Sequence, residues 1–265
     1  MIKNKSKKST KAPISINDKK RKGILFSEIN ETILSDKTKF NIKEAYKTMR
    51  TNIMFATGSE EDKTCKTIIV TSSIPGEGKS LTSINTAIAF AQTGKKVLLI
   101  DCDLRKAKLH KYMLVENKVG LSNVLGGFDK LEDAIIHIDK YGIDFVSSGH
   151  TPPNPIELLS SKMDKLLKSL SDKYDYVFLD TPPVNVVSDT AAISKMSDGI
   201  LFVVRHKYTT HDMVYKAVNS LEFVDAKILG FVLNDVDMSS YSYTAKTKYG
   251  SYKYKNYYSY NSYYY

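Results

Sequence analysis

Residues 67–94 read TIIVTSSIPGEGKSLTSINTAIAFAQTG, and this stretch decides the fold of the chain. The β-branched run at 67–72 predicts a buried strand, and the apolar periodicity of residues 80–92, which stops before Gly94, predicts a helix. The turn between them, SIPGEGKS, matches the phosphate-loop pattern G-x-x-x-x-G-K-[ST], except that Ser73 replaces the first glycine. This order of strand, glycine-rich turn and helix lets backbone N–H groups and a helix N-terminus surround a polyphosphate.

The glycines, the lysine and the last serine of this turn each have a chemical role toward a nucleotide. The glycines at 76 and 78 let the backbone approach the phosphates, because they carry no side chain. Lysine 79 supplies positive charge to the β- and γ-phosphates, and the hydroxyl of serine 80 is placed to bind Mg²⁺. We therefore predict ATP and Mg²⁺ as cofactors, with nucleotide contacts from Ser73, Pro75, Gly76, Glu77, Gly78, Lys79, Ser80 and Leu81.

Outside this segment, apolar runs alternate with helical patterns. We expect strands at 97–101, 142–147, 176–180, 200–204 and 228–233, and helices at 42–57, 163–170, 189–196 and 211–223. Strands that are apolar throughout and separated by helices indicate a parallel sheet covered on both faces. The predicted fold is therefore α/β, with a doubly wound, mostly parallel sheet of the P-loop NTPase type, similar to the partition ATPases.

Three aspartates end predicted strands. Asp101 and Asp103 stand in LLIDCD, two residues apart on an extended chain, so their side chains point the same way. Asp180 ends the run YVFLD and is the candidate for a metal-binding aspartate of the Walker B type. The carboxyl ends of strands face the ligand crevice in a doubly wound sheet. We predict a metal site that includes Ser80 and Asp180.

The positive charge of the chain is concentrated at its two ends. The formal net charge is +10, but residues 1–22 hold +8 and residues 241–265 hold +4, which leaves 23–240 at −2. A basic stripe on a folded face would indicate nucleic acid, and this distribution does not provide one. We expect a flexible basic arm at 1–22, a P-loop domain at 23–240, a disordered tail at 241–265, and no nucleic-acid partner.

Hydropathy and cysteine content indicate a cytoplasmic protein. No apolar run approaches the ~18 residues of a membrane helix, and we find no signal peptide. The two cysteines, Cys65 and Cys102, have no partners at metal-ligand spacing, which argues against a zinc site and fits a reducing compartment.

The C-terminal segment is rich in tyrosine and carries no aliphatic residue except Ala245. It holds 11 of the 18 tyrosines of the chain. A tyrosine hydroxyl has a pKa of about 10, so its attack on a γ-phosphate would gain from a nearby carboxylate. Either Asp101 or Asp103 can take that role, with Lys79 as the third catalytic residue. The candidate phosphate acceptors are Tyr241, Tyr243, Tyr249, Tyr252, Tyr254, Tyr257, Tyr258, Tyr260, Tyr263, Tyr264 and Tyr265.

Several motifs together resemble those of the bacterial tyrosine kinases of capsular polysaccharide synthesis, in their stand-alone cytoplasmic form. They are SIPGEGKS at 73–80, DCDLR at 101–105, FLDTPP at 178–183, GHTPPNPIELL at 149–159 and the tyrosine cluster. The resemblance implies that Asp103 joins Ser80 and Asp180 in the metal site, and that neighbouring subunits in a ring phosphorylate the tail. It also implies a membrane activator of the polysaccharide co-polymerase type, which recruits the kinase to the inner face of the membrane, and a protein-tyrosine phosphatase.

Two positions depart from the family pattern. The oligomerisation motif E-x-x-R-x-x-R appears here as Glu44, Lys47 and Arg50, so a point charge replaces a planar bidentate donor and ring formation is expected to weaken. Ala107 stands where a proline is usual. Asn234, at the end of the last predicted strand, would contact adenine by analogy with related ATPases, or would cap the strand.

Two alternatives belong to other functional classes. Partition and division-site ATPases are nucleotide-driven binding switches, but they carry an additional lysine in K-G-G-x-G-K-[ST], and Ile74 occupies that place here. A second alternative makes the tail an adhesive aromatic segment on a generic ATPase. A kinase of the eukaryotic type is excluded, because the chain has neither H-R-D nor D-F-G.

Overall fold

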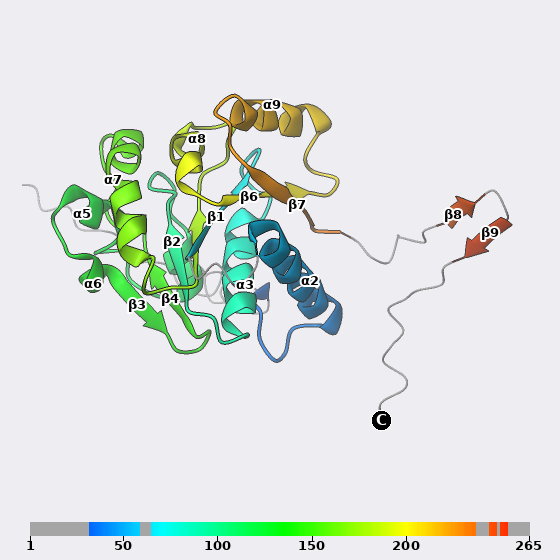
Figure 1. Ribbon diagram of the computed structural model, residues 1–265, viewed down its shortest axis with the longest axis horizontal. Coiled ribbons are helices and arrows are strands. Elements are labelled where there is room, and N and C mark those ends of the chain that lie inside the picture. The colour runs from blue at the N-terminus through cyan, green and yellow to red at the C-terminus, as the bar shows by residue number, and fades with distance from the viewer. Residues whose placement is uncertain (1–31, 59–64, 237–243, 248–249, 254–265) are drawn as a thin grey trace, which may run out of the picture.

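The computed structural model describes residues 32–58, 65–236, 244–247 and 250–253. Its centre is a seven-stranded sheet with the order β3-β4-β2-β5-β1-β6-β7 (Figure 1). All neighbouring strands are parallel except β3 and β4, which are antiparallel. The strands are β1 (Lys66–Ser72), β2 (Val97–Asp101), β3 (Ile135–Ile138), β4 (Ile143–Val146), β5 (Tyr176–Asp180), β6 (Gly199–Arg205) and β7 (Ile228–Asn234).

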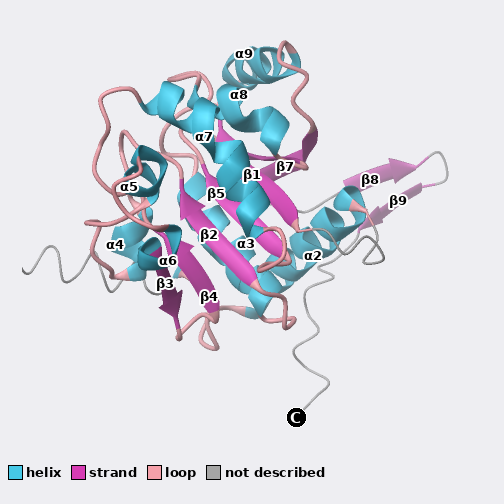
Figure 2. Ribbon diagram, turned by 60° about the vertical axis from the view of Figure 1, so that its left-hand side comes forward, coloured by secondary structure: helices cyan, strands magenta, loops and turns pink. Residues whose placement is uncertain are grey.

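Helices cover both faces of this sheet (Figures 1 and 2). On one face, α2 (Phe40–Thr57), α3 (Lys79–Ala91) and α4 (Leu109–Met113) enclose one buried apolar cluster. On the other face, a second cluster is enclosed by α5 (Leu121–Gly126), α7 (Pro155–Leu170), α8 (Asp189–Ile193) and α9 (His211–Glu222), with α6 (Leu131–Ala134) at its margin. The central strands β1, β2 and β5 are buried almost throughout, as apolar runs between two helical layers require.

The predicted fold class is confirmed, and the differences lie in single elements. The helix predicted at 163–170 begins eight residues earlier, at Pro155, because a proline is favoured in the first helical turn. The helix predicted at 189–196 divides into α8 and the 3-10 helix η1 (Ser194–Met196). Strand β3 and the short helices α4, α5 and α6 were not predicted, since segments of four to six residues carry too few apolar repeats to recognise.

The terminal segments are only partly described. The basic arm at 1–22 lies outside the described residues, as do all the candidate acceptor tyrosines except Tyr252. Within the tail, β8 (Thr244–Thr247) and β9 (Gly250–Lys253) pair as an antiparallel ribbon. None of the described helices is long and apolar enough to cross a membrane.

Candidate active site

The turn between β1 and α3 has the backbone shape of a phosphate loop. Gly76 and Gly78 have φ angles of 91° and 90°, in the region that side chains disfavour. A Cβ at Gly78 would also collide with the amide of Asn234, so this position accepts only glycine. The predicted nucleotide contacts lie in this turn and the first residues of α3, except Asn234, which ends β7. Leu81 packs its side chain against the core, which leaves its backbone N–H as the group available to a ligand.

The three predicted aspartates lie close to this loop, because they follow the carboxyl ends of parallel strands and the loop leaves β1 on the same side of the sheet. Asp101 and Asp180 are direct partners on the adjacent strands β2 and β5. Lys79 Nζ lies 3.4 Å from Asp180 Oδ2 and 3.6 Å from Asp103 Oδ2. The Ser80 hydroxyl donates to Asp180 Oδ2 at 2.7 Å. One lysine, one hydroxyl and three carboxylates therefore form a single buried cluster.

Burial and mutual repulsion change the proton affinities in this cluster. Burial raises the pKa of Asp180, although the charge of Lys79 and the hydroxyl of Ser80 oppose the rise. Burial also raises the pKa of Asp101, to about 7, with the charge of Asp180 acting in the same direction. For Lys79, burial lowers the pKa, but the charges of the three aspartates outweigh it and the net pKa is raised. Lys79 is therefore a cation in the folded protein.

Asp101 and Asp103 differ in their surroundings, although they are two residues apart. Asp101 is fully buried, and its carboxylate accepts backbone N–H groups from residues 103, 108 and 109. Asp103 is 8% exposed, accepts one backbone N–H from Lys106, and directs its other oxygen toward Lys79. The backbone thus fixes Asp101, whereas Asp103 faces the phosphate loop.

Ser83 belongs to the cluster but was not predicted. Its hydroxyl donates to Asp180 Oδ1 at 3.1 Å, while Ser80 holds the other oxygen of the same carboxylate. The two serines are three residues apart on α3, and residues at that spacing share a helix face. This spacing was the available signal in the sequence. Asp180 is therefore oriented from both sides by the helix that follows the loop.

A second group of contacts, also unpredicted, holds the phosphate loop from the β6 and β7 side. Buried Glu77 accepts the hydroxyls of Ser73 and Thr209, at 2.9 and 2.5 Å. Further donors reach the carbonyls of residues 75, 76 and 77, and they come from Tyr208, Arg205 and Asn234 respectively. The Asn234 amide thus binds the loop backbone at 2.9 Å. No sequence signal marks Thr209, because only the ends of β6 and β7 bring this turn to the loop.

The cluster fits a magnesium–nucleotide complex better than a metal held by protein alone. In the described part of the chain, no group of three or more His, Cys, Asp or Glu side chains is arranged to hold a metal ion. Mg²⁺ prefers oxygen ligands and usually combines one or two carboxylates with substrate phosphates and water. Ser80, Asp103 and Asp180 offer such oxygens beside a loop whose glycines leave room for phosphate.

The three residues of the predicted oligomerisation motif lie on α2. Glu44 and Lys47 form an exposed ion pair of 2.7 Å within the helix. Arg50 instead donates to the carbonyl of Ala89 at 2.8 Å, near the C-terminus of α3. The first two side chains therefore remain at the surface, while the third ties α2 to its own subunit.

Comparison with known proteins identifies the family. A family profile described as an AAA domain matches residues 65–230, which include the whole cluster. The tyrosine-protein kinase YwqD of Bacillus subtilis is 42% identical over 200 residues, covering 75% of this chain and 83% of that protein. The chain belongs to the bacterial tyrosine kinases. The cluster around Lys79 lies within the part of the chain that matches this profile.

Solved structures agree with this assignment. The kinase domain of the Escherichia coli tyrosine kinase Etk is 36% identical to this kinase and superposes with a TM-score of 0.71, over 77% of this chain and 80% of that one. The septum site-determining protein MinD of Pyrococcus horikoshii, solved with Mg-ADP, is 26% identical with a TM-score of 0.55, over 64% and 70% of the two chains. The kinase therefore shares its sheet with division-site ATPases, as the predicted fold implied.

Proposed function

We propose that this kinase transfers the γ-phosphoryl group of Mg-ATP to tyrosines of its own segment 241–265, between subunits, and thereby regulates capsular polysaccharide synthesis and export. The observation that carries the proposal is the buried cluster in which Lys79 contacts Asp103 and Asp180 beside Ser80. A chain with this cluster also ends in 11 clustered tyrosines, which supplies the acceptor hydroxyls.

The residues of the cluster suit distinct parts of phosphoryl transfer. Lys79 and the loop N–H groups would hold the β- and γ-phosphates, and Ser80, Asp103 and Asp180 would hold Mg²⁺. The bound ion would neutralise charge that develops on the phosphates. The phenolic proton would pass to Asp101 or Asp103. Asp103 directs one oxygen toward the phosphate loop, and Asp101 has a pKa of about 7, which suits a base that works near neutral pH.

The contacts to Glu77 and to the loop carbonyls fit a supporting role in ATP binding. Thr209, Tyr208 and Asn234 fix the loop before the nucleotide arrives, so less ordering is required on binding. Asn234 would then act by positioning the loop, and any adenine contact would be additional to that.

The family assignment supports a proposal for assembly and partners. We propose a homo-oligomeric ring that uses the exposed pair Glu44 and Lys47 on α2, with a contribution from Arg50. A membrane protein of the polysaccharide co-polymerase type would activate the cytoplasmic kinase and recruit it to the inner face of the membrane. A protein-tyrosine phosphatase would reverse the modification. The lysine at position 47 is expected to make the assembly weaker than an arginine would.

The test separates donor and acceptor subunits. Lys79→Met protein with an intact tail is mixed with wild-type protein that lacks residues 241–265, in Mg-ATP, together with the activator fragment. Because the first protein cannot bind phosphate normally and the second has no tail, label on the Lys79→Met tail requires transfer between subunits. We expect that label by mass spectrometry.

Each other result has a defined meaning. Full-length wild-type protein is incubated separately. If its tail is labelled while the Lys79→Met tail in the mixture is not, transfer between subunits is contradicted but the kinase activity is supported. Absence of tyrosine label in every mixture and in full-length wild-type protein would refute the proposed activity. The division-site type of switch would then be favoured, and its test is nucleotide-dependent dimerisation without covalent change.

A further inference from the structure

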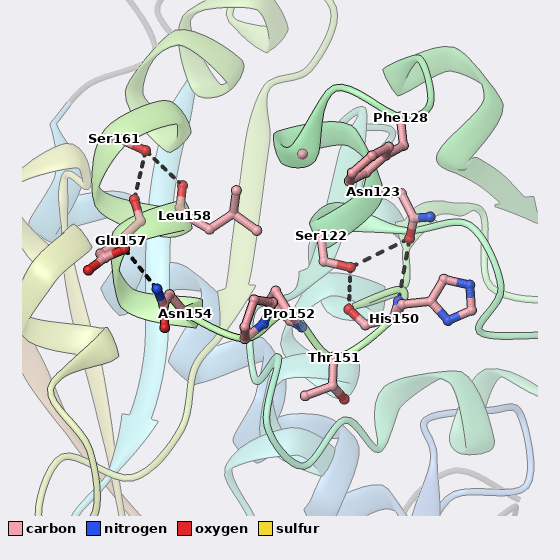
Figure 3. Close-up of a pocket in the computed structure, with 12 residues that line it drawn as sticks. Ser122, Asn123, Phe128, His150, Thr151, Pro152, Asn154, Glu157, Leu158 and Ser161 are labelled. Carbon is pink, nitrogen blue, oxygen red and sulfur yellow. Dashed lines mark hydrogen bonds between the residues drawn. The ribbon is translucent and has the colours of Figure 1, made fainter.

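A pocket lies near the carboxyl ends of the strands, and none of its lining residues belongs to the cluster around Lys79. It has a volume of about 650 Å³ and lies between the end of α5, the loop that leaves β4, and the first turns of α7 (Figure 3). This size is within the ~300–1,000 Å³ of sites that hold drug-sized ligands. The loop carries the sequence GHTPPNPIELL, which contributed to the family resemblance without having a role in catalysis.

The loop that lines the pocket is fixed before any ligand binds. The Ser122 hydroxyl donates to the carbonyl of His150, and Asn117 accepts the backbone N–H of Gly149 at 2.8 Å. A Cβ at Gly149 would collide with the side chain of Asn123, and one at Gly120 would collide with the loop backbone. Two glycines therefore allow a close approach that holds the wall of the pocket in place.

The lining is apolar and aromatic, with neutral polar groups at its margin. Phe128 is 83% exposed, and in Figure 3 it approaches the hollow from the side opposite Leu158. Two prolines, 152 and 153, complete the apolar surface. Among the lining residues Glu157 is the one with a formal charge, and no lysine or arginine is among them.

We propose that this pocket binds the unphosphorylated tyrosine segment at residues 254–265 of this same chain sequence. That segment holds seven tyrosines with serine, asparagine and lysine between them. Tyrosine rings suit a surface of proline and phenylalanine, and their hydroxyls suit neighbouring amide and hydroxyl groups such as Asn123 and Ser161. The segment also carries one lysine, Lys255, and no acidic side chain, which matches the single negative charge of Glu157.

The position of the pocket would make such docking productive. Strand β4 is the neighbour of β2, with Val146 opposite Ile100, so the pocket loop and Asp101 leave the same edge one strand apart. Neighbouring strands are ~4.8 Å apart, and the five spacings from β7 to β4 amount to about 24 Å. The 29 residues after position 236 can span up to ~100 Å when extended, so the tail can reach the pocket.

The same chemistry would distinguish substrate from product. Phosphorylation adds about −1.5 to −2 charges to a tyrosine. The lining has no lysine or arginine to receive them, has His150 as its one basic side chain, and places Glu157 nearby. A phosphorylated ring would therefore be released, and the pocket would hold an unmodified tyrosine while its neighbours along the chain reach the catalytic cluster. This inference rests on the proposed function for its meaning, but the docking itself needs no catalysis.

Cross-linking in the full-length chain tests the docking. We would place p-benzoylphenylalanine at position 128, or at position 223 as a matched control, in Lys79→Met protein that cannot phosphorylate itself. Phe223 is 90% exposed and does not line the pocket. After irradiation and digestion, we expect cross-links from position 128 to residues 254–265 and none from position 223.

Phosphorylation of the tail in the same protein, by added wild-type kinase, should reduce the cross-link at least fivefold. Cross-links to the folded part of a second copy, equal cross-links from both positions, or none at all would overturn the proposal. A cross-link that persists on the phosphorylated tail would overturn the discrimination between substrate and product.

Kinetics gives a second measurement. Phe128→Ala should slow tail phosphorylation about tenfold, because an aromatic contact contributes about 1.4 kcal/mol. Phe128→Tyr should restore it, and Phe223→Ala should stay within twofold of wild type. Equal rates for Phe128→Ala and wild type would contradict a productive role. If wild-type protein leaves its tail unmodified, the proposed function fails, while the cross-link in Lys79→Met protein still reports docking independently.

Discussion

Where β1, β2 and β5 end, the phosphate loop is surrounded by buried charges, whereas the pocket beside β4 is lined by an exposed phenylalanine and by side chains of which only Glu157 carries a formal charge. The charge of Lys79 offsets the repulsion among the carboxylates of Asp101, Asp103 and Asp180, so the cluster is held by electrostatic contacts. The pocket instead takes its shape from close glycine contacts and hydrogen bonds within its loop. Fixed charge suits a phosphate, and a preformed apolar hollow suits a polypeptide segment.

If this contrast holds, the largest effect should come from removing the charge of the loop. Lys79→Met should reduce tyrosine phosphorylation by on the order of 10²–10³, as the loss of one preorganised donor to the reacting group does in other enzymes. The measurement is the initial rate of ³²P incorporation. Lys162→Met, which changes an exposed lysine on α7, is the control. A loss of less than tenfold would mean that Lys79 is not aligned with the phosphates.

The next largest effect should come from Asp101. In the wild-type kinase, kcat/KM should rise with pH and level off above about 7, because the carboxylate accepts the phenolic proton only when ionised. Asp101→Asn should lower the rate about a hundredfold and abolish this rise. A rise that persists in Asp101→Asn but disappears in Asp103→Asn would assign the proton to Asp103.

Asp101 should also affect stability in a defined direction. Its pKa is raised in the folded state, so it favours folding while protonated, and that contribution is lost as the pH rises from about 4 to about 7. Asp101→Asn should therefore flatten the fall in unfolding free energy over this range. Urea denaturation at several pH values measures it.

A third test addresses the pocket wall. Gly149→Ala should lower the free energy of unfolding by about 2 kcal/mol or more, because it combines a positive φ angle with a collision against Asn123. Gly142→Ala is the matched control, since its φ is also positive but its Cβ would meet no atom within 4 Å. Equal losses of stability in the two variants would show that close packing at Gly149 has no effect.

The smallest effect is expected for the contacts to Glu77. Thr209→Val removes a hydroxyl that donates to this buried carboxylate, so the KM for ATP should rise about tenfold and the free energy of unfolding should fall by about 1–3 kcal/mol. Thr210→Val is the control, because Thr210 makes no side-chain capping bond to α9. A changed kcat at constant KM would place Thr209 in the chemical step instead.

The sequence by itself determined the fold class and most of the buried cluster around Lys79. The turn at 73–80 between a strand and a helix predicted a phosphate loop. The apolar runs that end in aspartate predicted that carboxylates gather where the parallel strands end. Both conclusions rest on local chemistry, namely backbone freedom at glycine and the burial of parallel strands. Strand register then brought Asp101 and Asp180 side by side as the pattern indicated.

Only the tertiary structure decided which residues support that site. Thr209 and Asn234 reach the loop because β6 and β7 end beside it, and their distance in sequence from Glu77 leaves no periodic signal. The surroundings that separate Asp101 from Asp103 depend on where the following loop turns back. The pocket is the clearest case, since Phe128 and Leu158 face one another only after α5 and α7 pack against the same face of the sheet. Long-range packing, which short sequence patterns do not encode, is the physical reason in each case.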